Sequence, residues 1–524
     1  MKELIYGRTL LAAARRTPTA IAVRDIDGYT ATYSEHVERV ARLANYLRAN
    51  KWRRFAVLAV NGHHFLECWH AALLGAGLIV PLNYRLSAHE LAELIDDASV
   101  DAVLVDPAYT ELLDASLDMT SVKPEVVVLG NSVGFEQRLA EIEALLPPEP
   151  EEDDIVALMY TGGTTGRPKG ALISHRAEVL NMYHQNEVLE PDENTVFLHQ
   201  SPMFHGGAIY GILNPLARGG QVCFVPKFDA VDVANAIAEY GVTATQMGPT
   251  MIAMLLDGVG SRIDLLSTLE QLVFGTAPTP LALLERLRRE LPRVKVFNGY
   301  GMTEAASALS YLRHEEHFLD GGRLLTSVGR PLTGVDITIR DDEGREVPVG
   351  VIGEICARAG NFMTGYWNRE AETADAFRGG WYHTGDLGRV DSDGYLFVVD
   401  RLKEMIVSGG ENVYSAEVEN AVARHPGVAQ CAVIGIPHDR WGQSVHAVVV
   451  LRPETLVDEQ ELDAFVRAFI AGFKVPKSWD IRTEPLPMSG AMKVLKRELH
   501  DAAIADTSAV QASTLIPTHP STGR

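Results

Sequence analysis

A glycine- and threonine-rich segment at residues 160–170 (YTGGTTGRPKG) is the part of the chain best suited to bind an anion. Its small residues let the backbone fold tightly, so that several N–H groups and hydroxyls point toward one phosphate. Lys169 adds a positive charge. The spacing is not that of a Walker A loop, because Gly166 is followed by Arg167 rather than by lysine. We interpret the segment as a phosphate-binding loop, and a flexible surface turn is the alternative.

A second cluster, residues 298–304 (NGYGMTE), follows an apolar run that reads as a strand. Ligands of open α/β sheets bind at the carboxyl ends of strands, so the placement suits a site. Glu304 is a suitable Mg²⁺ ligand, Thr303 could donate to a phosphate, and Tyr300 could stack on a base. The alternative is a glycine-rich turn between a strand and a helix.

A third cluster, residues 382–388 (YHTGDLG), places Asp386 between two glycines. An isolated carboxylate of this kind could accept hydrogen bonds from a ribose diol. It could equally stabilise a turn.

The elements that must position these clusters alternate between short apolar runs and amphipathic helical patterns. The runs expected to be strands are residues 55–60, 78–82, 102–105, 126–129, 155–160, 196–200, 222–226, 243–247, 271–274 and 295–297. This alternation predicts the α/β class, with buried parallel sheets covered by helices.

The pattern changes after about residue 325, where short strands separated by DDEG and DSDG turns predict a β-rich subdomain. From Arg401 onward the pattern becomes a small α+β unit. We therefore expect a large N-terminal domain (1–400) of packed α/β sheets plus the β-rich subdomain, and a small mobile C-terminal domain (401–504). The polar residues 505–524 are expected to be a disordered tail.

Composition limits the function classes. With 524 residues the chain is too long for one hydrophobic core. Its 47 basic and 69 acidic side chains give a net charge of −22, which disfavours nucleic acid and anionic membranes as partners. The four cysteines form no CxxC pair, and we find neither a signal peptide nor a transmembrane run. These features predict a cytoplasmic protein without a zinc site.

Seven segments together resemble, in order and spacing, the adenylate-forming superfamily of acyl-CoA synthetases, luciferases and nonribosomal peptide adenylation domains. They are residues 160–170, 201–211 (SPMFHGGAIYG), 275–278 (GTAP), 298–304, 381–388 (WYHTGDLG), 400–419 and 486–499. The resemblance implies an ATP-dependent carboxylic acid–CoA ligase. Such an enzyme forms acyl-AMP and pyrophosphate, and then acyl-CoA and AMP, using ATP, Mg²⁺ and coenzyme A.

The resemblance also implies site residues. The catalytic ones would be Lys493, Thr303 and Glu304, with Glu304 as the metal ligand. Nucleotide-binding residues would be Thr161, Gly162, Gly163, Thr164, Thr165, Gly166, Lys169, Gly275, Thr276, Ala277, Pro278, Asn298, Gly299, Tyr300, Gly301, Asp386 and Arg401. The acid and coenzyme A would meet His205, Ser408, Gly409, Gly410 and Glu411, and Lys403 would be the hinge of a rotating C-terminal domain.

The acid is expected to be apolar, because Gly206, Gly207, Gly211 and Gly275 would leave room for a large acyl group. A fatty acid is expected ahead of an aryl acid such as a cinnamate. A stand-alone adenylation enzyme that loads a carrier protein is the alternative function, and a degenerate nucleotide-binding protein is a further one, since Met492 stands where the family has glycine. The motif GNSVG (residues 130–134) also matches a serine-hydrolase elbow. A homodimer is the default oligomeric state.

Overall fold

The computed structural model describes residues 4–130, 134–161, 168–275, 277, 279–438, 440–489 and 493–504. Six groups of expectations lie outside these residues: those on residues 131–133 of the GNSVG motif, on residues 162–167, on Thr276, on Pro278, on Met492 and on the tail after residue 504.

A seven-stranded sheet carries the glycine–threonine segment, with strand order β18-β8-β7-β4-β3-β5-β6. Its strands are β3 (Arg54–Leu58), β4 (Leu78–Pro81), β5 (Ala102–Val105), β6 (Glu125–Val128), β7 (Ile155–Thr161), β8 (Lys169–Ser174) and β18 (Gly365–Tyr366). The pairs among β3 to β7 are parallel, whereas β8 and β18 run antiparallel to their neighbours.

A nine-stranded sheet has the order β15-β14-β13-β12-β11-β9-β10-β1-β2. Its strands are β1 (Ile21–Asp25), β2 (Thr30–Thr32), β9 (Val196–His199), β10 (Gln221–Phe224), β11 (Ala244–Met247), β12 (Gln271–Gly275), β13 (Lys295–Met302), β14 (Ser307–Leu312) and β15 (Arg330–Pro331). The sheet is parallel in its centre and antiparallel at both ends. The expected parallel strands thus form the centres of the sheets, and antiparallel hairpin partners join at the edges without a crossover helix.

Twelve of the α-helices accompany these strands. They are α1 (Tyr6–Arg16), α2 (Tyr33–Ala49), α3 (His63–Leu73), α4 (Ala88–Ala98), α5 (Thr110–Leu117), α6 (Phe135–Glu141), α7 (His175–Leu189), α8 (Gly206–Arg218), α9 (Ala230–Tyr240), α10 (Pro249–Val259), α11 (Leu281–Glu290) and α12 (Glu370–Ala376). Capping boxes begin α2 and α4, where Thr32 pairs with Glu35 and Ser87 with Glu90. The largest core cluster joins the two sheets through Val57, Val23 and the fully buried Trp69 on α3. The two sheets therefore share one hydrophobic core.

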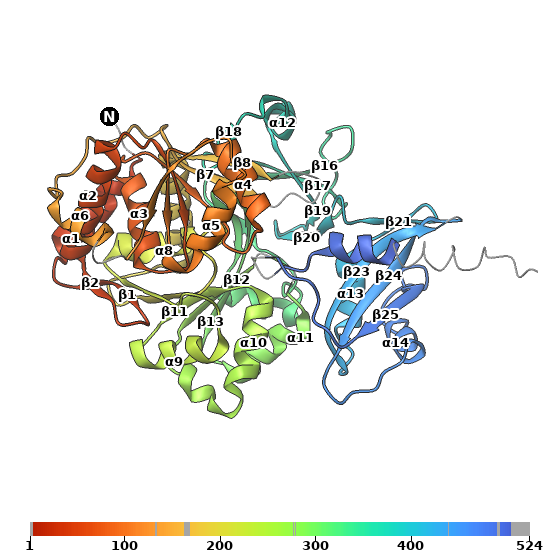
Figure 1. Cartoon of the computed structure of the whole chain (residues 1–524). Helices are drawn as coiled ribbons and strands as arrows, with labels where there is room; N and C mark the ends of the chain where they lie inside the picture. The colour runs from red at the N-terminus through yellow and green to blue at the C-terminus, as the bar shows by residue number, and fades with distance from the viewer. Residues whose placement is uncertain are drawn as a thin grey trace, which may run out of the picture.

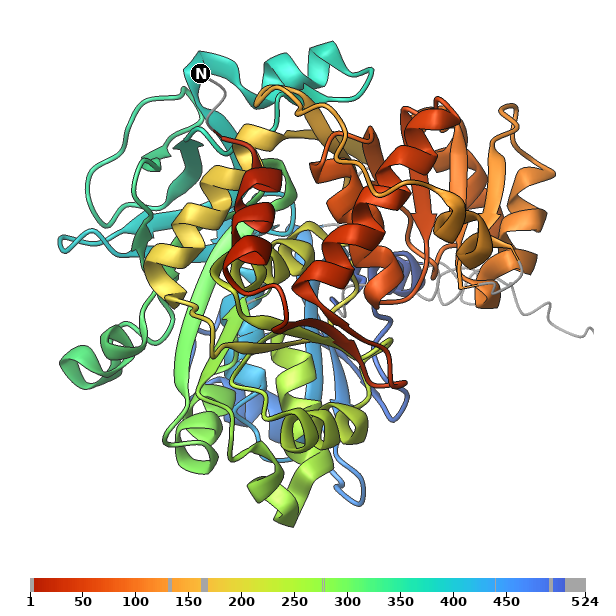
Figure 2. The ribbon, with the colours of Figure 1, turned by 90° about the vertical axis from the view of Figure 1, so that its left-hand side faces the viewer.

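The β-rich part forms a four-stranded antiparallel sheet, β16 (Asp336–Arg340), β17 (Gly353–Arg358), β19 (Tyr382–Val390) and β20 (Leu396–Arg401). The fourth sheet comprises β21 (Ile406–Ser408), β22 (Glu411–Val413), β23 (Val428–His438), β24 (Gly442–Leu451) and β25 (Ser478–Arg482), with helices α13 (Ser415–Val422) and α14 (Glu459–Val466). It has its own core around Val433, Val445 and Leu462. This C-terminal unit (blue) stands beside the rest of the protein in Figure 1 and lies behind its green part in Figure 2.

The α/β class is confirmed, with a large N-terminal part and a small C-terminal part. Within the described ranges, every helix is either too short or too polar to cross a bilayer.

Candidate active site

Two paired strands, β7 and β8, flank the glycine–threonine segment. Strands β7 and β8 are antiparallel, and Thr161 pairs with Lys169 at the open end of the ladder. The hydroxyl of Thr161 also donates to the Lys169 carbonyl over 3.3 Å. The two ends of the glycine–threonine segment therefore lie side by side at one edge of the sheet.

Lys169 connects this hairpin to the second cluster through Tyr366 on β18. The ammonium nitrogen of Lys169 lies 5.0 Å from the centre of the Tyr366 ring, a cation–π distance. The Tyr366 hydroxyl donates to Oε1 of Glu304 over 2.9 Å. The lysine of the loop and the expected metal ligand thus meet on one aromatic side chain.

Glu304 lies in a short 3₁₀ turn (Thr303–Ala305) directly after β13. Burial raises the pKa of its carboxyl group, and the hydrogen bond from Tyr366 and the charge of Arg401 oppose that shift. A carboxylate in such a place gains stability from a nearby cation, and carboxylate oxygen is a ligand that Mg²⁺ accepts. The surroundings of Glu304 therefore fit a magnesium ligand.

Asp386 forms the next part of the site together with two residues that the sequence also indicated. The Tyr300 hydroxyl donates to Oδ2 of Asp386 over 2.8 Å, and Arg401 Nε lies 3.7 Å from Oδ1. Arg401 is also the partner of Asp386 in the β19–β20 ladder. Burial raises the pKa of Asp386, and the charge of Arg401 works against this rise. Tyr300 serves here as a hydrogen-bond donor, a contact that the expected stacking on a base did not include.

Lys493 reaches this group from the C-terminal unit. Its backbone is held by two hydrogen bonds to Ser489, of 2.7 and 3.1 Å. Burial and the charge of Arg401 lower the pKa of Lys493 to about 8, while Asp386, Glu404 and Glu304 raise it. The ammonium group therefore lies within electrostatic reach of two carboxylates assigned to nucleotide and metal.

His205 precedes α8 and packs its ring against Phe204, with 4.6 Å between ring centres. Burial, followed by the charges of Lys493 and Arg85, lowers the pKa of His205 to about 3, so the ring is neutral at physiological pH. Its Nε2 atom is buried and has no hydrogen-bond partner within the described part of the chain. A neutral aromatic wall of this kind suits an apolar acid.

Of the glycines expected to make room for the acid, Gly275 has a different structural role, which Gly301 shares. A Cβ atom on Gly275 would lie 2.3 Å from the carbonyl oxygen of Gly299, and one on Gly301 would lie 1.5 Å from that of Ser307. Both residues permit close approach of neighbouring strands. Gly275 therefore says nothing about the size of the acid.

Other predicted nucleotide residues lie along the same sheet edge. Gly275 ends β12 and pairs with Gly299 on β13, and Ala277 follows as an exposed residue. The buried Asn298 donates its amide to the Ser327 carbonyl over 2.9 Å, which fixes β13 in place. Strand β13 continues through Met302 rather than ending at residue 297, because its second half pairs with β14.

The residues expected to serve the second half-reaction lie in the turn after β20 and in the C-terminal sheet. Lys403 is exposed in the turn after β20. Ser408 and Glu411 pair across the β21–β22 hairpin, whose turn residues Gly409 and Gly410 have φ values of 62° and 87°. The hairpin belongs to the C-terminal sheet (Figure 1), where the Gly409 N–H donates to the carbonyl of Trp441 over 2.9 Å.

Sequence reasoning missed three residues of the site. Tyr366 contacts Glu304, Glu404 lies near Lys493, and Glu354 holds the backbone beside Asp386. The only sequence signal for Glu404 is its position three residues after Arg401. Nothing in the sequence pattern connects the other two residues to the site.

Comparisons with known proteins agree over most of the chain. Residues 10–367 match the family model described as AMP-binding enzyme, and residues 417–493 match that of the AMP-binding enzyme C-terminal domain. A feruloyl-CoA synthase of Amycolatopsis sp is 39% identical over 95% of this chain and 99% of its own length. A fatty acid–[acyl-carrier-protein] ligase of Streptomyces coeruleorubidus is 32% identical over 94% and 96%. The structure of o-succinylbenzoate CoA synthetase from Bacillus subtilis with its acyl-adenylate intermediate has a TM-score of 0.82 and 30% identity, and covers 94% and 97%.

Proposed function

The chain belongs to the AMP-binding enzyme family and is an AMP-forming acid–CoA ligase, and we propose that its acid is an apolar aryl acid, activated at the site formed by Glu304, Asp386 and Lys493. The observation that carries the proposal is the placement of Lys493 among these carboxylates. ATP and coenzyme A are substrates of this family.

In the first half-reaction a carboxylate attacks the α-phosphate of ATP, which brings two anions together. Lys493 would place its ammonium group beside the carboxylate and the bridging oxygen, where negative charge develops in the transition state. Glu304 would hold Mg²⁺, which supplies positive charge to the phosphates when bound. Asp386 and Arg401 would hold the ribose, and Thr161 to Lys169 would hold the β- and γ-phosphates.

In the second half-reaction the thiol of coenzyme A attacks the mixed anhydride. The C-terminal unit would rotate about Lys403, which withdraws Lys493 and brings the hairpin turn Ser408–Glu411 to the site. The proposal of two working arrangements is supported by the position of that hairpin in the C-terminal sheet, where its contact is with Trp441.

The nature of the acid rests on three observations. The neutral His205 ring beside Phe204 favours an apolar acid, and the 39% identity to a feruloyl-CoA synthase favours an aryl one. The steric reason for Gly275 removes one ground for expecting a long acyl chain. We therefore place hydroxycinnamates such as ferulate before fatty acids.

Transfer to a carrier protein is the second candidate. It is favoured by the 32% identity to a fatty acid–[acyl-carrier-protein] ligase. Coenzyme A and a carrier protein present the same pantetheine thiol, so the first half-reaction would be unchanged. The identity of the thiol acceptor must therefore be tested in the second half-reaction.

The test is an assay of the purified protein with ATP, Mg²⁺ and a panel of acids. We expect pyrophosphate release that depends on the acid and is fastest with a hydroxycinnamate, followed by AMP release that depends on coenzyme A. Faster release with a medium- or long-chain fatty acid would reject the aryl acid. Acyl-adenylate that reacts with a pantetheinylated carrier protein but not with coenzyme A would reject the CoA acceptor.

We also propose that the protein works in the reducing cytoplasm as a homodimer. All four cysteines are unpaired in the described structure, which agrees with a reducing compartment. Sedimentation analysis would test whether the protein is a homodimer.

A further inference from the structure

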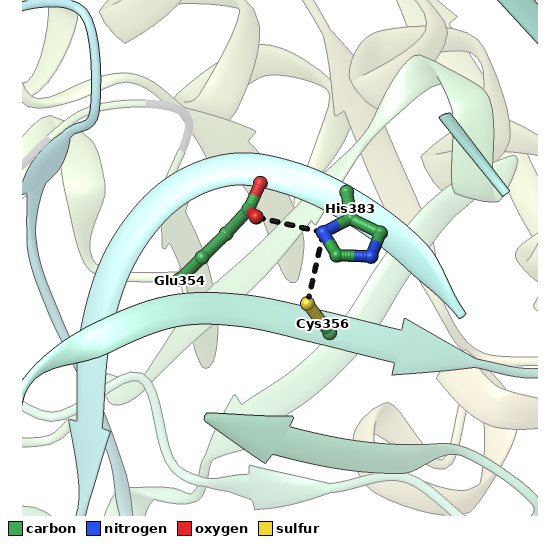
Figure 3. A group of neighbouring side chains, drawn as sticks. All are labelled: Glu354, Cys356 and His383. Atoms are coloured by element: carbon green, nitrogen blue, oxygen red, sulfur yellow. Dashed lines mark hydrogen bonds and ion pairs between the residues drawn. The ribbon is translucent and has the colours of Figure 1, made fainter. Parts of the chain in front are cut away.

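Three side chains that no proposed step uses converge beside the site. Glu354 and Cys356 lie on β17 and His383 on β19, and Figure 3 shows them pointing toward one another. The His383 Nδ1 atom is 2.7 Å from Oε2 of Glu354 and 3.4 Å from Sγ of Cys356. A carboxylate, a thiol and an imidazole at these distances raise two questions: whether they bind a metal ion, and what they do otherwise.

The surroundings oppose a metal ion. Oε2 of Glu354 also accepts a hydrogen bond of 3.1 Å from Arg378, so a guanidinium group already neutralises the carboxylate. Cys356 is fully buried, and burial raises the pKa of its thiol to about 12. A metal ion would need the thiolate. The positive charge and the protonated thiol thus make cation binding unfavourable.

The register of the two strands shows what the cluster does instead. Cys356 pairs with His383 and Glu354 pairs with Leu387, so the single residue between them on β17 faces three residues of β19. The extra residues form a β-bulge that contains Thr384, Gly385 and Asp386. Bulges next to active sites redirect a side chain, and this one presents Asp386.

Glu354 fastens this bulge at two points. Its Oε1 atom accepts the Gly385 N–H over 3.1 Å, and its Oε2 atom accepts from His383 Nδ1. Gly385 has a φ of 71°, so the bond holds a residue in the left-handed region. Thr384 adds a third attachment, because its hydroxyl donates to the Ile355 carbonyl over 2.7 Å and accepts the Asp386 N–H over 3.1 Å.

We infer that Glu354 and His383 are positioning residues, which fix the bulge that presents the Asp386 carboxylate to the ribose of ATP. The inference rests on the ribose-binding role proposed for Asp386. It predicts that loosening the bulge weakens recognition of the ribose hydroxyls and leaves recognition of the acid unchanged. Cys356 contributes packing to the cluster and is not required for this positioning.

The experiment compares ATP with 2′-deoxy-ATP and 3′-deoxy-ATP in pyrophosphate release, using Glu354→Gln, Cys356→Ala and the parent. In glutamine one of the two carboxylate oxygens becomes an NH2 group, which cannot accept from His383 or from Gly385, so one of the two bonds is lost. We expect the preference for ATP in Glu354→Gln to fall by about tenfold, as for one misplaced hydrogen bond to a charged group, with the KM for the acid unchanged. Cys356→Ala should retain the parent's preference.

A second pair of variants covers the case in which Glu354→Gln does not fold. The side-chain amide of asparagine can take the place of the Nδ1–H donor, whereas leucine cannot donate. His383→Asn should therefore keep the preference for ATP, and His383→Leu should lose it. Equal preference in these two variants would overturn the inference.

Two more readouts separate the possible failures. Amide hydrogen exchange at residues 383–388 should be faster in Glu354→Gln than in Cys356→Ala, and unchanged exchange would reject the fastening of the bulge. If Asp386→Asn keeps the parent's preference for ATP, the ribose role is wrong even though exchange shows the bulge to be fastened. Stoichiometric zinc or iron in the purified protein, lost equally in Cys356→Ala and Glu354→Gln, would show a metal site instead.

Discussion

The hydroxyl of Tyr300 donates a hydrogen bond of 2.8 Å to the carboxylate of Asp386, 86 residues farther along the chain. Tyr300 lies on β13 of the nine-stranded sheet and Asp386 on β19 of the four-stranded sheet. The contact therefore joins two separately built sheets at the point where we place the nucleotide. The donor is a neutral hydroxyl and the acceptor is a carboxylate. A hydrogen bond to a charged group is stronger than one between two neutral groups.

This contact predicts a specific loss of ATP affinity. Tyr300→Phe should raise the KM for ATP by about tenfold, because Asp386 loses a donor that orients it. In the double variant that combines Tyr300→Phe with Asp386→Asn, the rise in the KM for ATP should be no larger than in Asp386→Asn alone. Steady-state kinetics of pyrophosphate release measure both.

A matched control is Tyr395→Phe, which removes a similar contact of 3.0 Å to Glu316, a residue outside the site. It should leave the KM for ATP unchanged. Additive effects of Tyr300→Phe and Asp386→Asn would show that the two residues bind ATP independently.

The second prediction concerns pH. Burial and the charge of Arg401 lower the pKa of Lys493 to about 8, and the lysine is charged below that value. Because adenylation needs the positive charge, kcat/KM should fall above pH 8, by about tenfold per pH unit. The fall in kcat should begin at a higher pH than the fall in kcat/KM, because bound ATP favours the charged form of the lysine. A kcat/KM that stays constant from pH 7 to 10 would contradict a role for this ammonium group.

A third prediction concerns stability. Glu178 on α7 is fully buried, and neither carboxyl oxygen has a hydrogen-bond partner among the described residues. Burial raises the pKa of Glu178 well above its usual value, so the folded protein favours the protonated form. The unfolded chain ionises this group above about pH 4.5 and gains stability as pH rises. Glu178→Met should therefore stabilise the protein by about 1–3 kcal/mol at pH 8, and by less at pH 4.

Denaturant unfolding at the two pH values measures this difference. Glu67 provides the contrast, because it is equally buried but accepts a hydrogen bond of 2.7 Å from Arg39. Glu67→Met should destabilise the protein, because it removes one of the two carboxylates that pair with Arg39 and leaves Glu136 as its remaining partner. The interpretation of Glu178 would be wrong if its replacement also destabilised the protein at pH 8.

Much of the fold follows from local patterns in the sequence. The apolar runs at residues 102–105 and 155–160 correspond to β5 and β7, because short β-branched segments buried in parallel sheets have a clear signature. The clusters around Glu304 and Asp386 were also recognisable, since glycines beside a single carboxylate are unusual in a regular element.

What the sequence could not supply is pairing between distant strands. Residues 298–302 were expected to follow a strand that ends at residue 297, but they form the second half of β13, because β14 pairs with them. The bulge around Asp386 depends on the register between β17 and β19, and the role of Glu354 depends on that bulge. Tyr366 likewise reaches Glu304 only because the two-stranded contact of β18 with β8 brings it there.

We propose that Lys493 provides the charge for adenylation and takes no part in thioester formation. Lys493→Ala tests it most directly, with acid-dependent pyrophosphate release measured beside conversion of a supplied acyl-adenylate by coenzyme A. We predict that the first rate falls by at least about 100-fold, the loss expected for a group that stabilises transition-state charge, while the second stays close to the parent's. Equal rates in variant and parent for pyrophosphate release, or an equal loss in both half-reactions, would contradict the claim.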